Sequence, residues 1–281
     1  MLERLNLDGK VVLVTGGGTG LGFGMVMALA EAGANLAIAG RRQQPIDDAA
    51  DSVKKLGRDA VAISADVSDS SQVADLVSKT LAHYGRIDVL INNAALVSEN
   101  VRKPIWEITD SEWQGAMDVN LNGAFYCSRE VAKCMSEAGS GKIINVASGF
   151  GLRGGRDIYM YCVSKGAIIQ LTRVLSFSLA RYGITANTIA PGFIPTESTN
   201  SDIRNTLPAS GDFLPIGKLG VPEHLGPVAV FLASPASDYM TGEVMIVDGL
   251  ALGPLHKILE VHRHRLKIVG LIHHPLADET G

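Results

Sequence analysis

The chain has 281 residues, of which 46% are hydrophobic and only 19% are charged, and its formal net charge is −4 at pH 7. This composition allows a large buried core and excludes a disordered chain. No stretch shows the clustered lysine and arginine of a nucleic-acid-binding surface, and no apolar run reaches the roughly 18–20 residues of a membrane span. We therefore expect a protein that binds neither nucleic acid nor membrane.

The cysteines and the first residues bear on the compartment. Cys127, Cys134 and Cys162 are an odd number without metal-like spacing, which indicates free thiols in a reducing environment. The segment from Met1 to Asn6 lacks the long apolar run of a secretion signal. Together these features predict a cytoplasmic protein.

Short apolar runs alternate with longer amphipathic stretches along the chain. The apolar runs predict strands at residues 11–14, 36–39, 61–63, 89–91, 142–146, 185–190 and 244–247. The stretches between them predict helices near residues 21–32, 46–56, 72–83, 111–135 and 158–182. Apolar strands that are each followed by a helix are typical of a parallel sheet covered on both faces. We predict an α/β fold, a single-domain, Rossmann-type, doubly wound sheet of about seven strands over residues 1–250, with ligands at the carboxyl ends of the strands.

Two regions depart from this alternation. Residues 193–220 are rich in Pro, Gly, Ser, Thr and Asn, which predicts a lid or a binding loop. Residues 251–281 form a C-terminal extension, which we expect to form an interface, to cover the active site or to be partly disordered. Five of the seven histidines lie in it: His256, His262, His264, His273 and His274. Their spacing does not suit converging ligands, so we expect no metal site.

A glycine-rich segment follows the first predicted strand and opens the first predicted helix. Its glycines at positions 16, 20 and 22 have the spacing G-x-x-x-G-x-G. They permit a tight turn and a close approach of the backbone to a diphosphate, which the N-terminus of the helix attracts. A glycine-rich turn without a ligand is the alternative. We predict dinucleotide contacts from Gly16, Thr19, Gly20, Leu21 and Gly22.

The end of the second predicted strand indicates which dinucleotide binds. A carboxylate at this point would accept hydrogen bonds from the adenosine ribose and favour NAD. The chain has Gly40, Arg41 and Arg42 instead. Arg41 can pair with a 2′-phosphate, so we predict that NADP(H) is preferred and that NAD(H) is possible. The alternative is that Arg41 and Arg42 are solvated charges at the start of a helix.

The candidate catalytic residues come from three separate parts of the chain. Tyr161 and Lys165 are four residues apart on a predicted helix and share one face, and an ammonium group beside a phenol lowers its pKa. Tyr161 is therefore the candidate acid and base, whereas Tyr159 has no lysine four residues on. Ser148 follows the fifth predicted strand and can hold a substrate oxygen, although a turn residue is the alternative. Asn120 lies inside a predicted helix that asparagine does not favour, and it can bind a water that relays protons to Lys165.

In order and spacing, these motifs resemble the short-chain dehydrogenases/reductases. The resemblance covers roughly residues 5 to 249 and rests on Thr15-Gly16, Gly20, Gly22, Asn92-Asn93-Ala94, Asn120, Ser148, Tyr161, Lys165, Asn187 and Pro191-Gly192. It implies a catalytic tetrad in which Ser148 orients and polarises the carbonyl and Tyr161 transfers the proton. Lys165 is implied to hold the nicotinamide ribose, and Asn120 to anchor the relay water.

The resemblance also implies further cofactor contacts and an assembly. The contacts are Asp66 and Val67 at the adenine, Asn92, Asn93 and Ala94 after the fourth strand, Tyr161 and Lys165, and Pro191, Gly192, Ile194 and Thr196 at the carboxamide. Members of the family usually form dimers or tetramers through their two long helices. Here these helices are predicted near residues 111–135 and 158–182, so we expect a homodimer or a homotetramer.

The substrate is a small molecule whose identity the motifs define only broadly. Residues 21–24 and 180–184 are similar to family members that act on sugars and sugar acids such as gluconate. Arg153 and Arg156 lie close enough in sequence to Ser148 to meet an anionic substrate, with solvated surface charges as the alternative. We predict interconversion of a ketone and a secondary alcohol on a sugar, sugar acid or polyol. One alternative is the reduction of 3-oxoacyl thioesters. The other is a non-catalytic dinucleotide sensor, and the presence of the whole tetrad disfavours this second alternative.

Overall fold

The computed structural model describes residues 2–96, 103–197, 214 and 216–249. The C-terminal extension predicted at residues 251–281 lies outside the described residues, as do residues 198–213 and 215 of the predicted loop. The described residues include no helix that is both long and apolar enough to cross a membrane.

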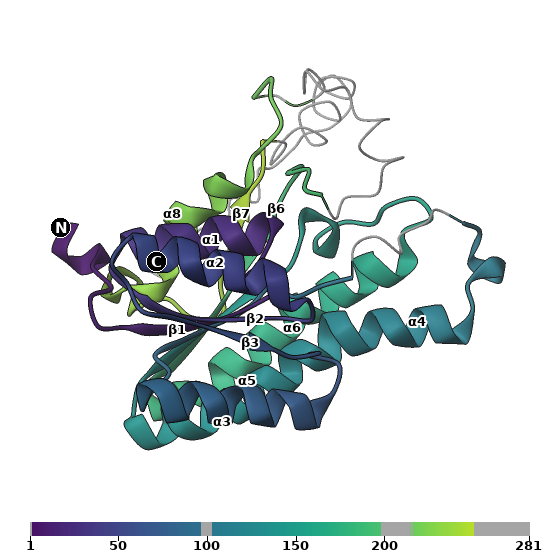
Figure 1. Cartoon of the computed structure of the whole chain (residues 1–281). Helices are drawn as coiled ribbons and strands as arrows, with labels where there is room; N and C mark the ends of the chain where they lie inside the picture. The colour runs from purple at the N-terminus through teal and green to yellow at the C-terminus, as the bar shows by residue number, and fades with distance from the viewer. Residues whose placement is uncertain (1, 97–102, 198–213, 215, 250–281) are drawn as a thin grey trace, which may run out of the picture.

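The predicted doubly wound sheet is confirmed. Seven parallel strands form one sheet in the order β3-β2-β1-β4-β5-β6-β7 (Figure 1). The strands are β1 (Val11–Thr15), β2 (Asn35–Gly40), β3 (Ala60–Ser64), β4 (Val89–Asn92), β5 (Gly141–Val146), β6 (Ile184–Pro191) and β7 (Val244–Val247). The chain builds outward from β1 to the β3 edge and then returns to place β4 on the other side of β1. Between β1 and β4 the order reverses, and ligands of doubly wound sheets bind at that point.

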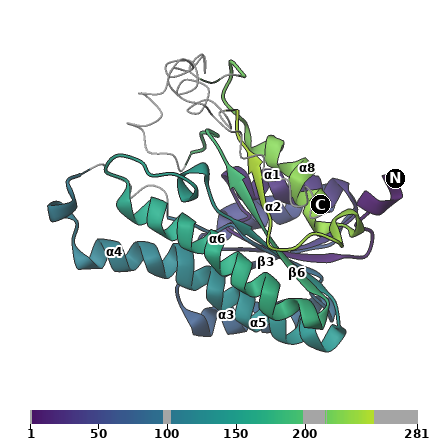
Figure 2. The same ribbon diagram turned by 180° about the vertical axis from the view of Figure 1, so that it is seen from behind.

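Helices cover both faces of the sheet, as Figures 1 and 2 show from opposite sides. One face carries α1 (Gly20–Glu31), α2 (Gln43–Lys55) and α8 (Gly226–Ala233), and the other carries α3 (Ser70–Tyr84), α5 (Gly123–Ala138) and α6 (Tyr159–Leu179). The remaining helical segments are η1 (Leu2–Leu5), η2 (Ile105–Glu107), α4 (Asp110–Met117), η3 (Asp118–Asn122), η4 (Gly149–Gly151), η5 (Ala180–Tyr182), η6 (Pro222–Leu225) and η7 (Pro235–Ser237).

The apolar strands are explained by two cores, one on each face of the sheet. Val12 and Val14 of β1 pack into the core under α1 and α2, whereas Leu13 between them packs into the core over α3 and α5. Successive side chains of a strand point to opposite faces, so a strand that is covered on both sides must be apolar throughout. All five residues of β1 are buried accordingly.

Two helical regions differ from the sequence-based prediction. The helix expected near residues 111–135 is interrupted by η3, one turn of π-helix, between α4 and α5. The α8 helix was not predicted, because it is short and its residues are apolar on every side, so they show no helical periodicity. It is buried against α1, which explains this composition.

Candidate active site

The glycine-rich loop after β1 is shaped by residues that must lack a side chain. Gly16 and Gly20 have φ angles of +64° and +55°, in the left-handed region that favours glycine. A Cβ atom on Gly22 would lie 2.1 Å from the carbonyl oxygen of Gly16, so the first turn of α1 packs directly on the loop. The loop therefore presents backbone at the start of α1, where the N–H groups and the helix dipole favour an anion.

Thr15 and Asn93 fasten this loop to the end of β4. The Thr15 hydroxyl oxygen accepts hydrogen bonds from the backbone N–H groups of Asn93 and Ala94, both at 3.1 Å. The Asn93 side chain donates in return to the carbonyl oxygens of Thr15, at 3.1 Å, and of Gly16, at 3.0 Å. The side chain of Asn93 thus holds the glycine-rich loop in place. Its neighbour Ala94, and not Asn93, lines the cavity beside this loop.

A cavity of about 430 Å³ opens at the carboxyl ends of the strands beside this loop. Its lining residues are Gly16, Gly18, Thr19, Gly40, Arg41, Arg42, Pro45, Ile46, Ala65, Asp66, Val67, Ala94, Ala95 and Val119. Most of the residues predicted to contact the cofactor's adenosine and phosphates are thus brought together. Arg41 and Arg42 are exposed, so both guanidinium groups are available to an anionic ligand. A glycine cradle beside two cations fits a dinucleotide with an additional phosphate.

The residues after β6 reach the glycine loop. A Cβ atom on Gly20 would lie 3.2 Å from Cγ2 of Thr196, so this side chain lies over the start of α1. Gly192 donates a backbone hydrogen bond of 2.9 Å to the carbonyl oxygen of Val247, and Ile194 and Leu21 pack against the core. The predicted carboxamide-binding segment therefore lies beside the phosphate loop.

Tyr161 and Lys165 lie in the first turns of α6 and face the end of β5. The Lys165 ammonium nitrogen is 5.7 Å from the centroid of the Tyr161 ring and donates a hydrogen bond of 2.8 Å to the carbonyl oxygen of Val146. The Lys165 residue is only 3% exposed. The predicted pair is thus brought together at the carboxyl edge of the sheet.

Burial changes the proton affinity of both groups. Desolvation lowers the pKa of Lys165 to about 8. Desolvation also raises the pKa of Tyr161, and a hydrogen bond with the Ser148 side chain opposes this effect. The expected lowering of the pKa of Tyr161 by Lys165 is thus not found, and burial of the phenol is the largest cause of the shift. A raised pKa keeps Tyr161 protonated at neutral pH, as a proton donor must be.

Ser148 is oriented by the 3-10 turn that follows β5. Its side-chain oxygen accepts a hydrogen bond of 3.1 Å from the backbone N–H of Phe150, which caps η4. Ser148 is buried, and its hydrogen bond with Tyr161 places the two hydroxyl groups together. A carbonyl oxygen that reaches both hydroxyl groups can therefore be held by one and protonated by the other.

Asn120 sits in the π-helical turn η3, which explains an asparagine inside a long helix. Its side-chain oxygen accepts a 2.7 Å hydrogen bond from the backbone N–H of Leu96, and its amide nitrogen donates a 3.1 Å hydrogen bond to the Ser164 hydroxyl. Single π-helical turns inside α-helices are frequent at functional sites. Asn120 is buried and joins the segment after β4 to α6, next to Lys165. Ser164 was not predicted from the sequence, although it lies between Tyr161 and Lys165.

A buried chain of polar side chains beside the site was also not predicted. Asn92 donates to the Asn145 side-chain oxygen at 2.8 Å, and Asn145 donates to the Thr172 hydroxyl at 2.9 Å. Thr188 donates to the same hydroxyl at 2.9 Å. The chain joins β4, β5 and β6 to α6 and gives Asn92 a role inside the protein. The expected cofactor contact of Asn92 stays a prediction. In the sequence, this chain of polar side chains is marked by a polar residue within each of the three apolar strands.

The two arginines expected near the substrate differ in environment. Arg153 forms an ion pair with Asp248, at 3.6 Å between Nη2 and Oδ2, which neither of the sequence-based alternatives anticipated. Arg156 is exposed. Arg153 therefore neutralises a charge of the protein itself.

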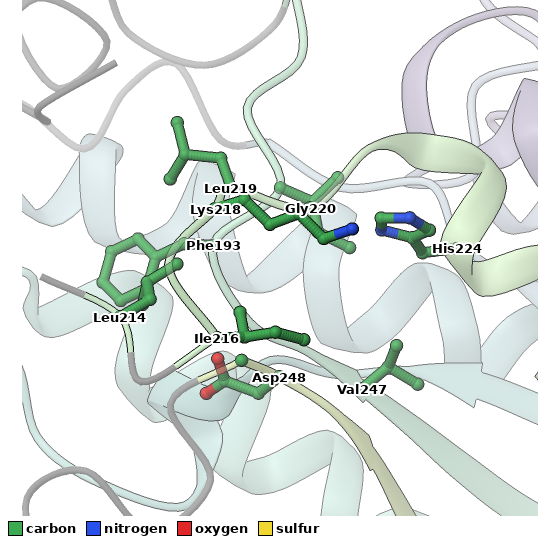
Figure 3. A pocket seen from close by; sticks show the side chains of 11 residues that line it. Phe193, Leu214, Ile216, Lys218, Leu219, Gly220, His224, Val247 and Asp248 are labelled. Atoms are coloured by element: carbon green, nitrogen blue, oxygen red, sulfur yellow. The ribbon is translucent and has the colours of Figure 1, made fainter. Parts of the chain in front are cut away.

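A second cavity, of about 290 Å³, lies between the residues after β6 and the end of β7 (Figure 3). Its walls are mostly apolar, and in Figure 3 the Lys218 side chain extends towards His224. Phe193 lines this cavity and also a smaller one, of about 20 Å³, that reaches Ser148.

Comparisons with known proteins agree with this geometry. A family model described as Enoyl-(Acyl carrier protein) reductase matches residues 16–249. A 2-dehydro-3-deoxy-D-gluconate 5-dehydrogenase from Dickeya dadantii (strain 3937) is 39% identical over 253 residues, which are 89% of this chain and 98% of that protein. The 3-oxoacyl-[acyl-carrier-protein] reductase FabG of Chlamydia pneumoniae is 36% identical over 246 residues, 87% of this chain and 98% of that protein. The crystal structure of a gluconate 5-dehydrogenase from Burkholderia cenocepacia J2315, in complex with NADP and tartrate, is 36% identical with a TM-score of 0.82, and the match covers 88% of this chain and 97% of that one.

The fold, the phosphate loop and the Tyr–Lys pair define an oxidoreductase built on a Rossmann-type sheet. With these matches, the chain belongs to the short-chain dehydrogenase/reductase family, as its motifs implied. It acts on alcohol and ketone groups.

Proposed function

We propose that this protein is an NADP(H)-preferring enzyme that interconverts a ketone and a secondary alcohol on a sugar acid. The observation that carries the proposal is the grouping of Ser148, Tyr161 and Lys165 at the carboxyl end of β5, beside the glycine loop. When bound there, the nicotinamide supplies the hydride for reduction or accepts it in oxidation.

The four side chains divide the remaining chemistry. Ser148 holds the substrate oxygen, and Tyr161 donates a proton to it during reduction or removes one during oxidation. Lys165, bound to the Val146 carbonyl oxygen, places a cation beside the Tyr161 ring. It would hold a ribose hydroxyl of the bound dinucleotide. Asn120 fixes the neighbouring segment and α6, and we propose that it anchors the water that returns the proton.

Two observations support NADP(H) over NAD(H). Gly40 leaves no carboxylate to repel a 2′-phosphate, and Arg41 and Arg42 line the adjoining cavity. The similar gluconate 5-dehydrogenase from Burkholderia cenocepacia was solved with NADP. We propose that Arg41 makes the charge-assisted contact to this phosphate.

The sugar-acid substrate is supported by the relatives and by one cation. Two of the similar proteins are named as dehydrogenases of gluconate or of a gluconate derivative. Lys218 in the second cavity suits a substrate that carries a carboxylate. Reduction of a 3-oxoacyl thioester is the second candidate, favoured by the likeness to the Chlamydia pneumoniae reductase and by the apolar walls of the same cavity.

We also propose a homodimer or homotetramer assembled through α4–α5 and α6. Large apolar side chains on these helices face solvent in the single chain, and Phe177 of α6 is 93% exposed. Phe125 and Val174 are exposed as well. Burial of such side chains between subunits is the usual basis of stable association. The cytoplasmic location stays a prediction from the sequence.

A substrate panel tests the proposed reaction. Purified protein is assayed by nicotinamide absorbance with sugar acids, polyols, 3-oxoacyl thioesters and cyclic ketones, each with both dinucleotides and in both directions. We expect kcat/KM for a sugar acid with NADP(H) to exceed the kcat/KM values for the other substrate classes by at least about tenfold. The Tyr161→Phe protein serves as the blank for contaminating activity. Highest turnover on a 3-oxoacyl thioester would establish the second candidate instead.

A further inference from the structure

An ion pair at the edge of the catalytic cleft joins two loops that are far apart in sequence. Asp248 follows β7, and its side chain is only 3% exposed. Arg153 follows η4 on the Ser148 loop, and its side chain is 31% exposed. A carboxylate this buried needs a compensating partner, since an unpaired charge away from water is strongly unfavourable.

The ion pair lies close to the backbone of the turn after β6 and of the Ser148 loop. A Cβ atom on Gly192 would lie 2.1 Å from Asp248 Oδ1, so the turn after β6 rests directly on this carboxylate. A Cβ atom on Gly149 would lie 3.5 Å from Arg153 Nη2 and 3.6 Å from Asp248 Oδ2. The ion pair therefore lies beside the residue that immediately follows Ser148, at a distance that leaves room for a methyl group.

Arg153 also contacts the residue that orients Ser148. Its guanidinium carbon lies 5.7 Å from the centroid of the Phe150 ring, and Phe150 packs edge-on against Phe193 at 6.2 Å. The backbone N–H of Phe150 donates the hydrogen bond that fixes the Ser148 side-chain oxygen. A continuous series of contacts thus runs from Asp248 through Arg153 and Phe150 to Ser148.

We infer that Arg153 and Asp248 are positioning residues for Ser148. The pair holds the loop after β5 against the end of β7 and the turn after β6, and it thereby keeps the Ser148 hydroxyl in place to bind the substrate oxygen. This inference rests on the proposed catalytic role of Ser148. A displacement of about 1 Å at such a group is sufficient to lower turnover by up to about a hundredfold.

A double-mutant cycle with Ser148 tests the inference. Arg153→Leu removes the charge that pairs with Asp248, and it is made in the native protein and in Ser148→Ala. In the native protein we expect kcat to fall by roughly ten- to a hundredfold with little change in the Kd for NADPH. In Ser148→Ala the same substitution should change kcat less than about twofold, because the group that it positions is absent.

The controls separate positioning from general damage. Arg58→Leu breaks another Arg–Asp pair, with Asp8 at 2.8 Å, on an exposed part of the surface, and should leave kcat unchanged. Arg153→Lys keeps the charge and should recover at least part of the loss. Asp248→Asn keeps the shape of the carboxylate and replaces Arg153→Leu in the cycle if that protein does not fold.

Three outcomes would overturn the inference. An equal fall in kcat in both backgrounds means that the pair does not act through Ser148. A rise in the KM for the substrate with unchanged kcat assigns Arg153 to substrate binding. If Ser148→Ala itself retains native turnover, the catalytic role of Ser148 and this inference are both wrong, whereas the first two outcomes leave the proposed function intact.

Discussion

The two halves of the cleft depend on different kinds of residue. On the dinucleotide side, at the ends of β1 and β2, function depends on missing side chains, because Gly16, Gly20 and Gly22 let backbone and helix meet. On the catalytic side, at the ends of β4 and β5, it depends on buried polar side chains such as Asn120 and Lys165. The glycines of the first half lie within one short segment, whereas the polar side chains of the second half come from distant segments.

The charged residues of the two halves differ in their exposure to solvent. Arg41 and Arg42 are solvated and exposed, so they are available to a ligand at little cost to the fold. Lys165 is buried, and its lowered pKa shows that the protein holds the charged form at the expense of stability. Changes in the catalytic half should therefore alter turnover and stability, and changes at the arginines should alter cofactor choice.

The largest expected effect is that of Tyr161→Phe. Loss of the proton-transferring hydroxyl should lower kcat/KM by about 10²- to 10⁴-fold, while the Kd for NADPH, measured by fluorescence titration, changes little. Tyr159→Phe is the matched control, because Tyr159 lies on the same helix as Tyr161. The Tyr159 hydroxyl contacts Asp157 at 3.4 Å and should be dispensable. Equal losses from both substitutions would remove Tyr161 from its proposed role.

The buried lysine should make stability depend on pH. The pKa of Lys165 is about 8 in the folded protein against 10.5 as its ordinary value, so between these pH values the unfolded chain binds more protons. The loss of unfolding free energy from burying the Lys165 ammonium is largest below pH 8, and it decreases as the pH rises towards 10.5. Relative to Lys165→Met, the native protein should gain about 2 kcal/mol of unfolding free energy between about pH 8 and pH 10.

Urea unfolding of both proteins over this pH range measures the difference. Lys55→Met is the control, because Lys55 is exposed on α2, and its difference from the native protein should not vary with pH. Parallel pH profiles for the native and Lys165→Met proteins would show that the ammonium is not desolvated.

A methyl group in the glycine loop should have the next largest effect. In Gly22→Ala the new Cβ atom meets the Gly16 carbonyl oxygen, so the loop or α1 must shift, at about 1–3 kcal/mol. NADPH binding should weaken together with stability. Gly115→Ala places the same group in open space on α4 and should not destabilise the protein. Thermal unfolding with and without NADPH compares the two, and equal losses would contradict the tight contact.

The smallest effect is expected at the edge of the dinucleotide side. Arg41→Ala should lower the ratio of kcat/KM with NADPH to that with NADH by about tenfold, the value of one charge-assisted hydrogen bond. Turnover with saturating cofactor should be retained. Arg58→Ala, which lies outside the cofactor cavity, should leave the ratio unchanged. An unchanged ratio in Arg41→Ala would assign the 2′-phosphate to another residue.

The sequence predicted what short-range patterns encode. The strands were predictable because a sheet covered on both faces requires apolar runs, and the Tyr161–Lys165 pair because residues four apart share a helix face. The Arg153–Asp248 pair and the contacts of Asn120 join segments that only the folded chain brings together. The direction of the pKa shift of Tyr161 also required the structure, since its largest cause is the burial of the phenol.

The central claim is that Ser148 and Tyr161 act on one substrate oxygen as a unit, and a double-mutant cycle tests it most directly. We expect Ser148→Ala and Tyr161→Phe each to lower kcat/KM steeply, and the double variant to lose about as much as the more damaged single variant. Losses that instead multiply in the double variant would show that the two hydroxyl groups work independently.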